Sequence, residues 1–276
     1  MIEPKQSINP PDDANAFYAD VLEVLNDSQV NYMVAGSFAS YTYTGRVPDT
    51  KDLDVFLCPE EVDDALEALK DAGYETELTY GYWIAKAWRG NNFVDLIFRA
   101  ASGLWEVEPE WLARAVPVTM WGVDTQVVAP EELIWSKAGL MDRERYDGNN
   151  VLHLLQAEAT ELDWPRLLEL AGDDWPLLLS HLTLFGYVYP DLASLIPKDL
   201  IARLALRLVN QQAADSPFNQ GASNGTPLCR GTLISNKQYL EDVEEMGYAD
   251  ARIAPWGRLS REQLAPWVQA VKRGDT

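Results

Sequence analysis

The chain has 276 residues, of which 47% are apolar and 24% charged, so it can bury a core and is neither a disordered nor a fibrous chain. Its 22 Lys and Arg against 43 Asp and Glu give a formal net charge of -21, which repels nucleic acid and anionic membrane at long range. Two cysteines form no disulfide framework, the N-terminus has no apolar signal region, and no run of about 18 apolar residues predicts a membrane span. We therefore expect a cytoplasmic protein without a membrane partner.

The first half of the chain alternates helical and strand patterns. Residues 1–11 carry three prolines and are expected to form a flexible tail. A proline in the first turn and a glycine after the last turn mark one helix, and Arg89 to Asn92 has the composition of a hairpin turn. Helices are predicted at 12–26, 38–44 and 59–72, and strands at 30–35, 53–57, 74–79, 82–88, 93–98, 116–120 and 123–128.

The second half is helical. Helices are predicted at 130–143, 148–159, 163–171, 174–187 and 197–213. A polar loop at 214–225 and a helix at 237–246 follow. This order predicts an α+β fold, a mixed β-sheet with flanking helices, and then a helical region. We expect domains at 12–129 and 130–213, and a segment at 214–276 that could close a cleft, bind a substrate or hold a dimer.

Three acidic residues stand on otherwise apolar strands. Asp52 and Asp54 are two residues apart in KDLDVFL, so both carboxylates leave the same face of a strand. Asp95 lies inside the apolar strand FVDLIF, where a carboxylate is costly unless it is paired or bound to a cation. If the two strands are neighbours, three carboxylates converge, and a divalent metal such as Mg²⁺ offsets their repulsion. Taken singly, Asp52 could be a loop residue, and Asp95 could pair with Lys86 or Arg99.

A second element lies upstream of these acids. Gly36 and Ser37 stand between an apolar strand and a short helix. Free backbone N–H groups at a helix start bind phosphate, and glycine allows close approach of the backbone. Alone, a strand-Gly-Ser-helix pattern is more often only a turn.

Together these residues resemble the nucleotidyltransferase superfamily with the polymerase-beta-like fold. That pattern is an apolar strand, Gly-Gly or Gly-Ser, a short helix and loop, Asp-x-Asp, and a third acid on a later strand. The chain reads VAGSFASYTYTGRVPDTKDLDVFL and then FVDLIF, and the likeness covers about residues 30–150. The long spacing before the acids is similar to the AbiEii-type toxin and the lincosamide and aminoglycoside adenylyltransferase branches.

The resemblance implies a role for each matching residue. Gly36 and Ser37 would hold the nucleotide phosphates. Asp52 and Asp54 would bind two metal ions, and Asp95 would ligate the second metal and act as, or orient, the base for the attacking hydroxyl. The implied cofactor is Mg²⁺ or Mn²⁺, and the co-substrate is an NTP, with ATP expected. The implied nucleotidyltransferase domain is residues 12–129.

Further basic and polar residues are nucleotide-binding candidates: Arg46, Thr50, Lys51 and Lys137. Lys137 matches a helix lysine of the toxin-type relatives, but Asn150 stands where those relatives have a second aspartate. A solvated helix end is an equal interpretation of Lys137.

The leading hypothesis is a metal-dependent transfer of NMP from an NTP to a hydroxyl acceptor. The acidic composition favours a small-molecule acceptor, such as an antibiotic, over RNA or protein. A homodimer or a cognate partner protein, as in a toxin-antitoxin pair, stays open. Two alternatives are a non-catalytic nucleotide-binding or antitoxin-like module, and an interaction protein whose acids are unrelated. The last alternative predicts that Asp52 and Asp95 lie far apart or on different faces.

Overall fold

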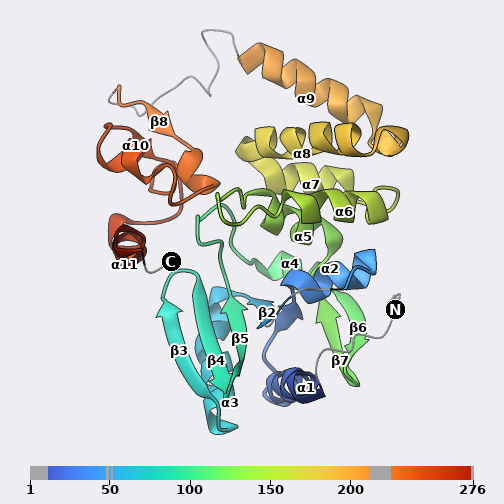
Figure 1. Cartoon of the computed structure of the whole chain (residues 1–276), viewed down its shortest axis with the longest axis vertical. Helices are drawn as coiled ribbons and strands as arrows, with labels where there is room; N and C mark the ends of the chain where they lie inside the picture. Colours follow the sequence, from blue (N-terminus) through green and yellow to red (C-terminus); the bar gives the residue numbers. More distant parts are fainter. Residues whose placement is uncertain (1–11, 48–49, 51, 212–224, 275–276) are drawn as a thin grey trace. The chain divides into compact units, whose positions relative to one another are not determined.

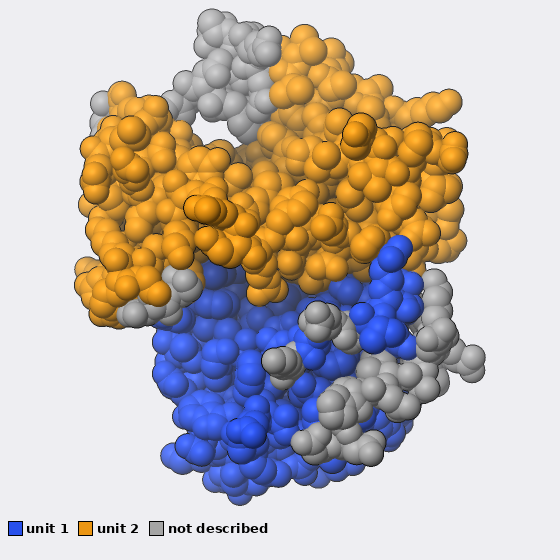
Figure 2. All heavy atoms as spheres, in the orientation of Figure 1, with its two compact units in different colours: residues 1–133 blue, residues 134–276 orange. Residues whose placement is uncertain are grey.

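The computed structural model describes residues 12–47, 50, 52–211 and 225–274. The chain forms two compact units, residues 1–133 and 134–276, which Figure 2 colours separately. The expected tail at 1–11 and most of the expected polar loop at 214–225 lie outside the described residues.

The first unit is built on one mixed seven-stranded sheet (Figure 1). Its strands lie in the order β3-β4-β5-β2-β1-β7-β6. The pairs β2·β5 and β1·β7 are parallel, and the other neighbours are antiparallel. The strands are β1 Tyr32–Val34, β2 Asp52–Leu57, β3 Glu75–Tyr80, β4 Ile84–Arg89, β5 Asn92–Ile97, β6 Val116–Met120 and β7 Val123–Val127. The predicted sheet with flanking helices is confirmed.

One face of the sheet's centre is apolar and covered by two helices, α1 Asp12–Asp27 and α3 Val62–Asp71. The buried residues alternate along β2 and β5, where Leu53, Val55, Val94 and Leu96 are all fully buried. Arg89, which shares this face, donates to Asp20 of α1 and to the carbonyl of Ala72, just after α3. The aspartates at the intervening positions therefore point to the opposite face.

Two further short helices belong to this unit. α2 Gly36–Thr44 begins two residues after β1 and packs against β2. It ends at Gly45, whose positive φ of 68° is the left-handed conformation that glycine adopts without strain. α4 Pro109–Arg114, which the sequence patterns did not predict, starts on a proline and buries Trp111.

The second unit is mainly helical. Its helices are α5 Pro130–Ala138, which begins in the first unit, α6 Gly148–Glu158, α7 Trp164–Ala171, α8 Trp175–Val188 and α9 Lys198–Gln211. The prediction of a helix to residue 143 is wrong, because Gly139 follows Ala138 and the amide of Leu140 turns back onto the carbonyl of Lys137. The helix α7 starts where Asp163 accepts a hydrogen bond from the amide of Arg166.

The C-terminal part of the second unit contains β8 Leu228–Cys229 and β9 Ala249–Asp250, a short parallel pair, and the helices α10 Leu240–Glu244 and α11 Arg261–Arg273. The helix expected at 237–246 is only five residues long. Residues 236–239 form turns instead of the expected first helical turn, and the Asn236 side chain accepts a hydrogen bond from Arg252.

Among the helices of the described ranges, none combines the length and the apolar character that crossing a bilayer requires.

Candidate functional site

Three carboxylates meet on the face of the sheet opposite α1 and α3. Asp54 and Asp95 are directly paired residues of the parallel strands β2 and β5, and Asp52 precedes Asp54 by two positions. One ligand atom of each residue lies within 4.8 Å of the others. Asp95 is buried, and Asp52 and Asp54 are half-buried. The interpretation in which the acids are unrelated predicted separate positions, and that prediction is wrong.

Gly36 lies against this cluster. Its φ is +58°, and a Cβ built on it would lie 1.7 Å from Asp54 Oδ2. A side chain at this position would therefore collide with the carboxylate. Glycine allows the start of α2 to approach Asp54 closely.

The strand order places the start of α2 beside the acids. The amide of Ala35 donates to the carbonyl of Asp54 at 2.9 Å, so the chain enters α2 directly from β1 at the level of that aspartate. Ala35 is the N-cap, and its side chain offers no hydrogen-bonding group to the first turn. Ser37, the second residue of the helix, is half-buried. A helix start with no capping side chain is suited to an anionic ligand.

Two neighbours orient the carboxylates. Lys86 of β4 is the cross-strand partner of Asp95, and its Nζ lies 2.6 Å from Asp95 Oδ1. The Thr50 hydroxyl donates to Asp52 Oδ1. Of the two cations that the sequence left open as partners of Asp95, Lys86 makes the pair, while Arg99 pairs with Glu106.

The cluster brings three acidic side chains together, and Lys86 forms an ion pair with one of them, Asp95. Excess negative charge at this spacing is unfavourable in a partly buried site. Carboxylate oxygens are the ligands that hard divalent cations such as Mg²⁺ prefer. The donor set of Asp52, Asp54 and Asp95 therefore fits such a cation.

The field of the cluster reaches Tyr18 of α1. Burial, and behind it the negative charge of Asp52, raises the pKa of the Tyr18 phenol above its usual value.

The remaining nucleotide-binding candidates are Arg46, Lys51 and Lys137. Arg46 is exposed after α2, and Lys51 lies outside the described residues. Lys137 belongs to the second unit, where it is buried and its Nζ lies 3.5 Å from Asp147 Oδ2. The roles of these residues stay predictions.

Sequence reasoning missed the support of α2. Trp121, in the turn between β6 and β7, packs edge-on against Phe38 of α2. Its ring centroid lies 5.0 Å from that of Phe38 and 5.1 Å from that of Tyr18. Its φ of 50° is unusual for a bulky residue and belongs to the two-residue hairpin turn that it forms with Gly122, whose φ is 85°. The predicted strands at 116–120 and 123–128 imply a turn between them but not this contact.

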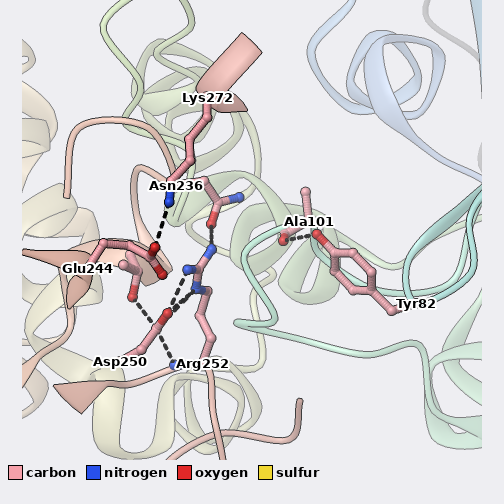
Figure 3. Close-up of polar contacts among 8 residues, drawn as sticks. Tyr82, Ala101, Asn236, Glu244, Asp250, Arg252 and Lys272 are labelled. Atoms are coloured by element: carbon pink, nitrogen blue, oxygen red, sulfur yellow. Dashed lines mark hydrogen bonds and ion pairs between the residues drawn. The ribbon is translucent and has the colours of Figure 1, made fainter. Parts of the chain in front are cut away.

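The C-terminal part of the second unit has its own buried polar cluster (Figure 3). Arg252 is only 1% exposed, and its guanidinium donates to both oxygens of Asp250 and to Asn236 Oδ1. The hydrogen bonds from Arg252 and Thr232 lower the pKa of Asp250 against the opposing effect of burial. These hydrogen bonds connect Arg252 to Asp250 and Asn236 inside the unit. We therefore assign Arg252 a structural role.

A family model described as a nucleotidyl transferase of unknown function (DUF2204) matches residues 14–169. No curated protein matches the sequence of this chain.

Three solved structures are similar to parts of the chain. The lincomycin-bound lincosamide antibiotic adenylyltransferase LnuA is 14% identical, with a TM-score of 0.38, and the match covers 54% of this chain and 98% of that one. An antigenic nucleotidyltransferase-like protein from Paracoccidioides brasiliensis is 16% identical, with a TM-score of 0.42, covering 67% and 92%. The antibiotic-resistance factor ANT(2'')-Ia is 16% identical, with a TM-score of 0.36, covering 71% and 96%.

Proposed function

Because the chain belongs to that family of nucleotidyl transferases, we propose that it moves an NMP group from an NTP, with ATP as the expected donor, to a hydroxyl acceptor, and that the reaction depends on Mg²⁺ or Mn²⁺. The observation that carries this proposal is the meeting of Asp52, Asp54 and Asp95 on one sheet face beside the start of α2.

Each residue of the site has a role in the proposed reaction. The N–H groups at Gly36 and Ser37 bind the phosphates of the NTP, since the open start of α2 favours an anion. Asp52, Asp54 and Asp95 hold the cation, which when bound neutralises charge on the triphosphate. Thr50 keeps the Asp52 carboxylate in place through its hydroxyl.

The chemical step follows from these positions. The acceptor oxygen forms a bond to the α-phosphorus, and the bond from that phosphorus to the bridging oxygen breaks. Pyrophosphate leaves with the electron pair, and the hydroxyl proton passes to the carboxylate of Asp95. In phosphoryl transfer the protein mainly positions the reactants and neutralises charge. The three carboxylates and the start of α2 are suited to these two tasks.

The ion pair between Lys86 and Asp95 affects how Asp95 is placed to accept the proton. It engages Asp95 Oδ1 and partly neutralises the cluster. Asp95 is thereby held in one orientation before substrates bind. Lys86 is a positioning residue in this scheme, because it acts through Asp95.

The proposal is tested with ATP labelled at either the α- or the γ-phosphate, incubated with Mg²⁺ or Mn²⁺ and fractions of small molecules and of RNA. We expect the α-label, and not the γ-label, to pass to an acceptor in the small-molecule fraction. Asp54→Asn should abolish transfer, and Asp63→Asn, at an exposed site of α3, is the matched control. Nucleotide binding without transfer in any fraction would instead indicate a non-catalytic nucleotide-binding module.

A further inference from the structure

A small pocket opens at the hairpin between β4 and β5. Its volume is about 270 Å³, slightly below the lower limit of roughly 300 Å³ for drug-sized ligand sites. It can therefore take one ring of a ligand together with that ring's substituents. The lining residues are Lys86, Trp88, Gly90, Asn91, Asn92 and Phe93.

The register of the strands joins this pocket to the acidic cluster. Trp88 pairs with Phe93 and Lys86 with Asp95, so all four side chains leave the same face of the hairpin. The Nζ of Lys86 lies 4.9 Å from the centre of the Phe93 ring and also contacts Asp95. Phe93 is in turn the neighbour of Asp52 on β2.

The sheet order fixes which side of the acids the pocket occupies. The start of α2 follows β1, Asp54 is on β2, Asp95 is on β5, and the pocket begins on β4. Because β2 and β5 lie between β1 and β4, the phosphate-binding helix start and the pocket flank the carboxylates on opposite sides. Asp95, which receives the acceptor's proton in the proposed reaction, is on the pocket side.

The lining chemistry selects a class of ligand. Trp88 and Phe93 offer ring surfaces for stacking, and Asn91 in the hairpin turn offers donors and acceptors for hydroxyl groups. Lys86 is the charged side chain among the six residues of the lining, which includes no acid. A polycationic acceptor would meet the cation of Lys86 and no carboxylate in this lining, and in the proposed reaction the neighbouring carboxylates of Asp52, Asp54 and Asp95 are already engaged by the divalent cation.

We propose that this hairpin pocket is the acceptor subsite, and that it takes a ring-bearing hydroxyl compound that is neutral or anionic rather than polycationic. The inference rests on the proposed nucleotidyl transfer. The inference adds to that function the side of the carboxylates from which the acceptor approaches and the charge class of the acceptor.

The experiment follows the tryptophan indole and backbone amide NMR signals of the full chain. The probes are phenyl β-D-glucoside, which is neutral, phenyl β-D-glucuronide, which is anionic, and neamine, which is polycationic. We expect both aryl glycosides, and not neamine, to shift the indole signal of Trp88. Asn91→Ala should weaken this binding about fivefold, the effect of losing one hydrogen bond. The indole of Trp83, near the other end of β4, is the internal control.

Three results would overturn the subsite: no Trp88 shift with either glycoside, an equal shift with neamine, or a Trp88 shift with Mg²⁺-ATP alone, which would place the nucleobase there. The amides of Gly36 and Ser37 report separately on Mg²⁺-ATP. If Mg²⁺-ATP shifts these two amide signals while the glycosides leave the Trp88 indole signal unchanged, the subsite is wrong and the proposed function stands. If Mg²⁺-ATP moves neither amide, the proposed function fails as well.

Discussion

The backbone of Gly36 and the carboxylate of Asp54 are so close that a Cβ on the glycine would lie 1.7 Å from Asp54 Oδ2. The start of α2 and the acidic cluster therefore form one structural unit. Gly36 also has a φ of +58°, which most residues with a side chain adopt only with strain.

Gly36→Ala should abolish ATP binding, because the methyl group displaces either Asp54 or the start of α2. Gly73→Ala is the matched control, since Gly73 has a φ of +87° but open space around its Cβ position. Backbone strain should cost each variant about 1–2 kcal/mol of unfolding free energy, and the collision with Asp54 adds to this cost in Gly36→Ala. Isothermal titration with ATP and Mg²⁺ separates them. Equal ATP binding by the two variants would contradict the role of the close contact.

Asp52→Asn should stabilise the metal-free protein, because it removes one of three neighbouring negative charges. The gain is about 1 kcal/mol, the Coulomb energy of two charges about 4 Å apart in water. Mn²⁺ should raise the unfolding temperature of the wild type and of the control Asp63→Asn, but not of Asp52→Asn. Differential scanning fluorimetry measures both effects. A Mn²⁺ response that survives in Asp52→Asn would argue against the proposed metal site.

Lys86→Met should lower kcat about tenfold and leave the affinity for ATP unchanged, because Lys86 orients Asp95 and has no contact with the start of α2 in the proposed scheme. Lys86→Arg, which can still form an ion pair, should restore most of the rate. Steady-state kinetics with ATP as the varied substrate provides the split between kcat and KM. A change in KM for ATP alone would assign Lys86 to nucleotide binding instead.

The buried His181 should make stability depend on pH. Burial lowers its pKa against a smaller raising effect from its hydrogen bond to the carbonyl of Ala138. In the unfolded chain this histidine has an ordinary pKa of about 6.5. As the pH falls below that value, the unfolded chain therefore binds a proton that the folded chain does not yet bind.

The free energy of unfolding should thus decrease from about pH 6.5 downwards, by at most about 1.4 kcal/mol per pH unit from this group. His181→Gln should remove that part of the slope, and His153→Gln, at the chain's other histidine, is the control. Urea unfolding at several pH values measures it. An unchanged slope in His181→Gln would show that His181 does not set the dependence.

The acidic cluster could be predicted because its signal is local. A period of two places Asp52 and Asp54 on one face, and an acid within FVDLIF demands a partner. The sequence left open whether Lys86 or Arg99 would pair with Asp95, since the answer depends on the register across the hairpin. In the structure Lys86 is directly opposite Asp95, and Arg99 lies beyond the strand and pairs with Glu106.

Features that depend on distant contacts could not be predicted. The packing of Trp121 on Phe38 joins residues far apart in the chain, and the parallel pair of β8 and β9 is only two residues long. The expected helix at 237–246 is regular only from Leu240 to Glu244, and the Asn236 side chain before it is engaged by Arg252. Local helical periodicity contains no information on such competing partners.

Titration of the protein with ATP, in Mg²⁺ and in EDTA, tests most directly whether the three carboxylates and the start of α2 form a nucleotide site. We predict binding that requires Mg²⁺, is lost in Asp54→Asn and is retained in Asp63→Asn. Binding that is equally strong in EDTA or in Asp54→Asn, or no binding of any of the four NTPs, would contradict the account.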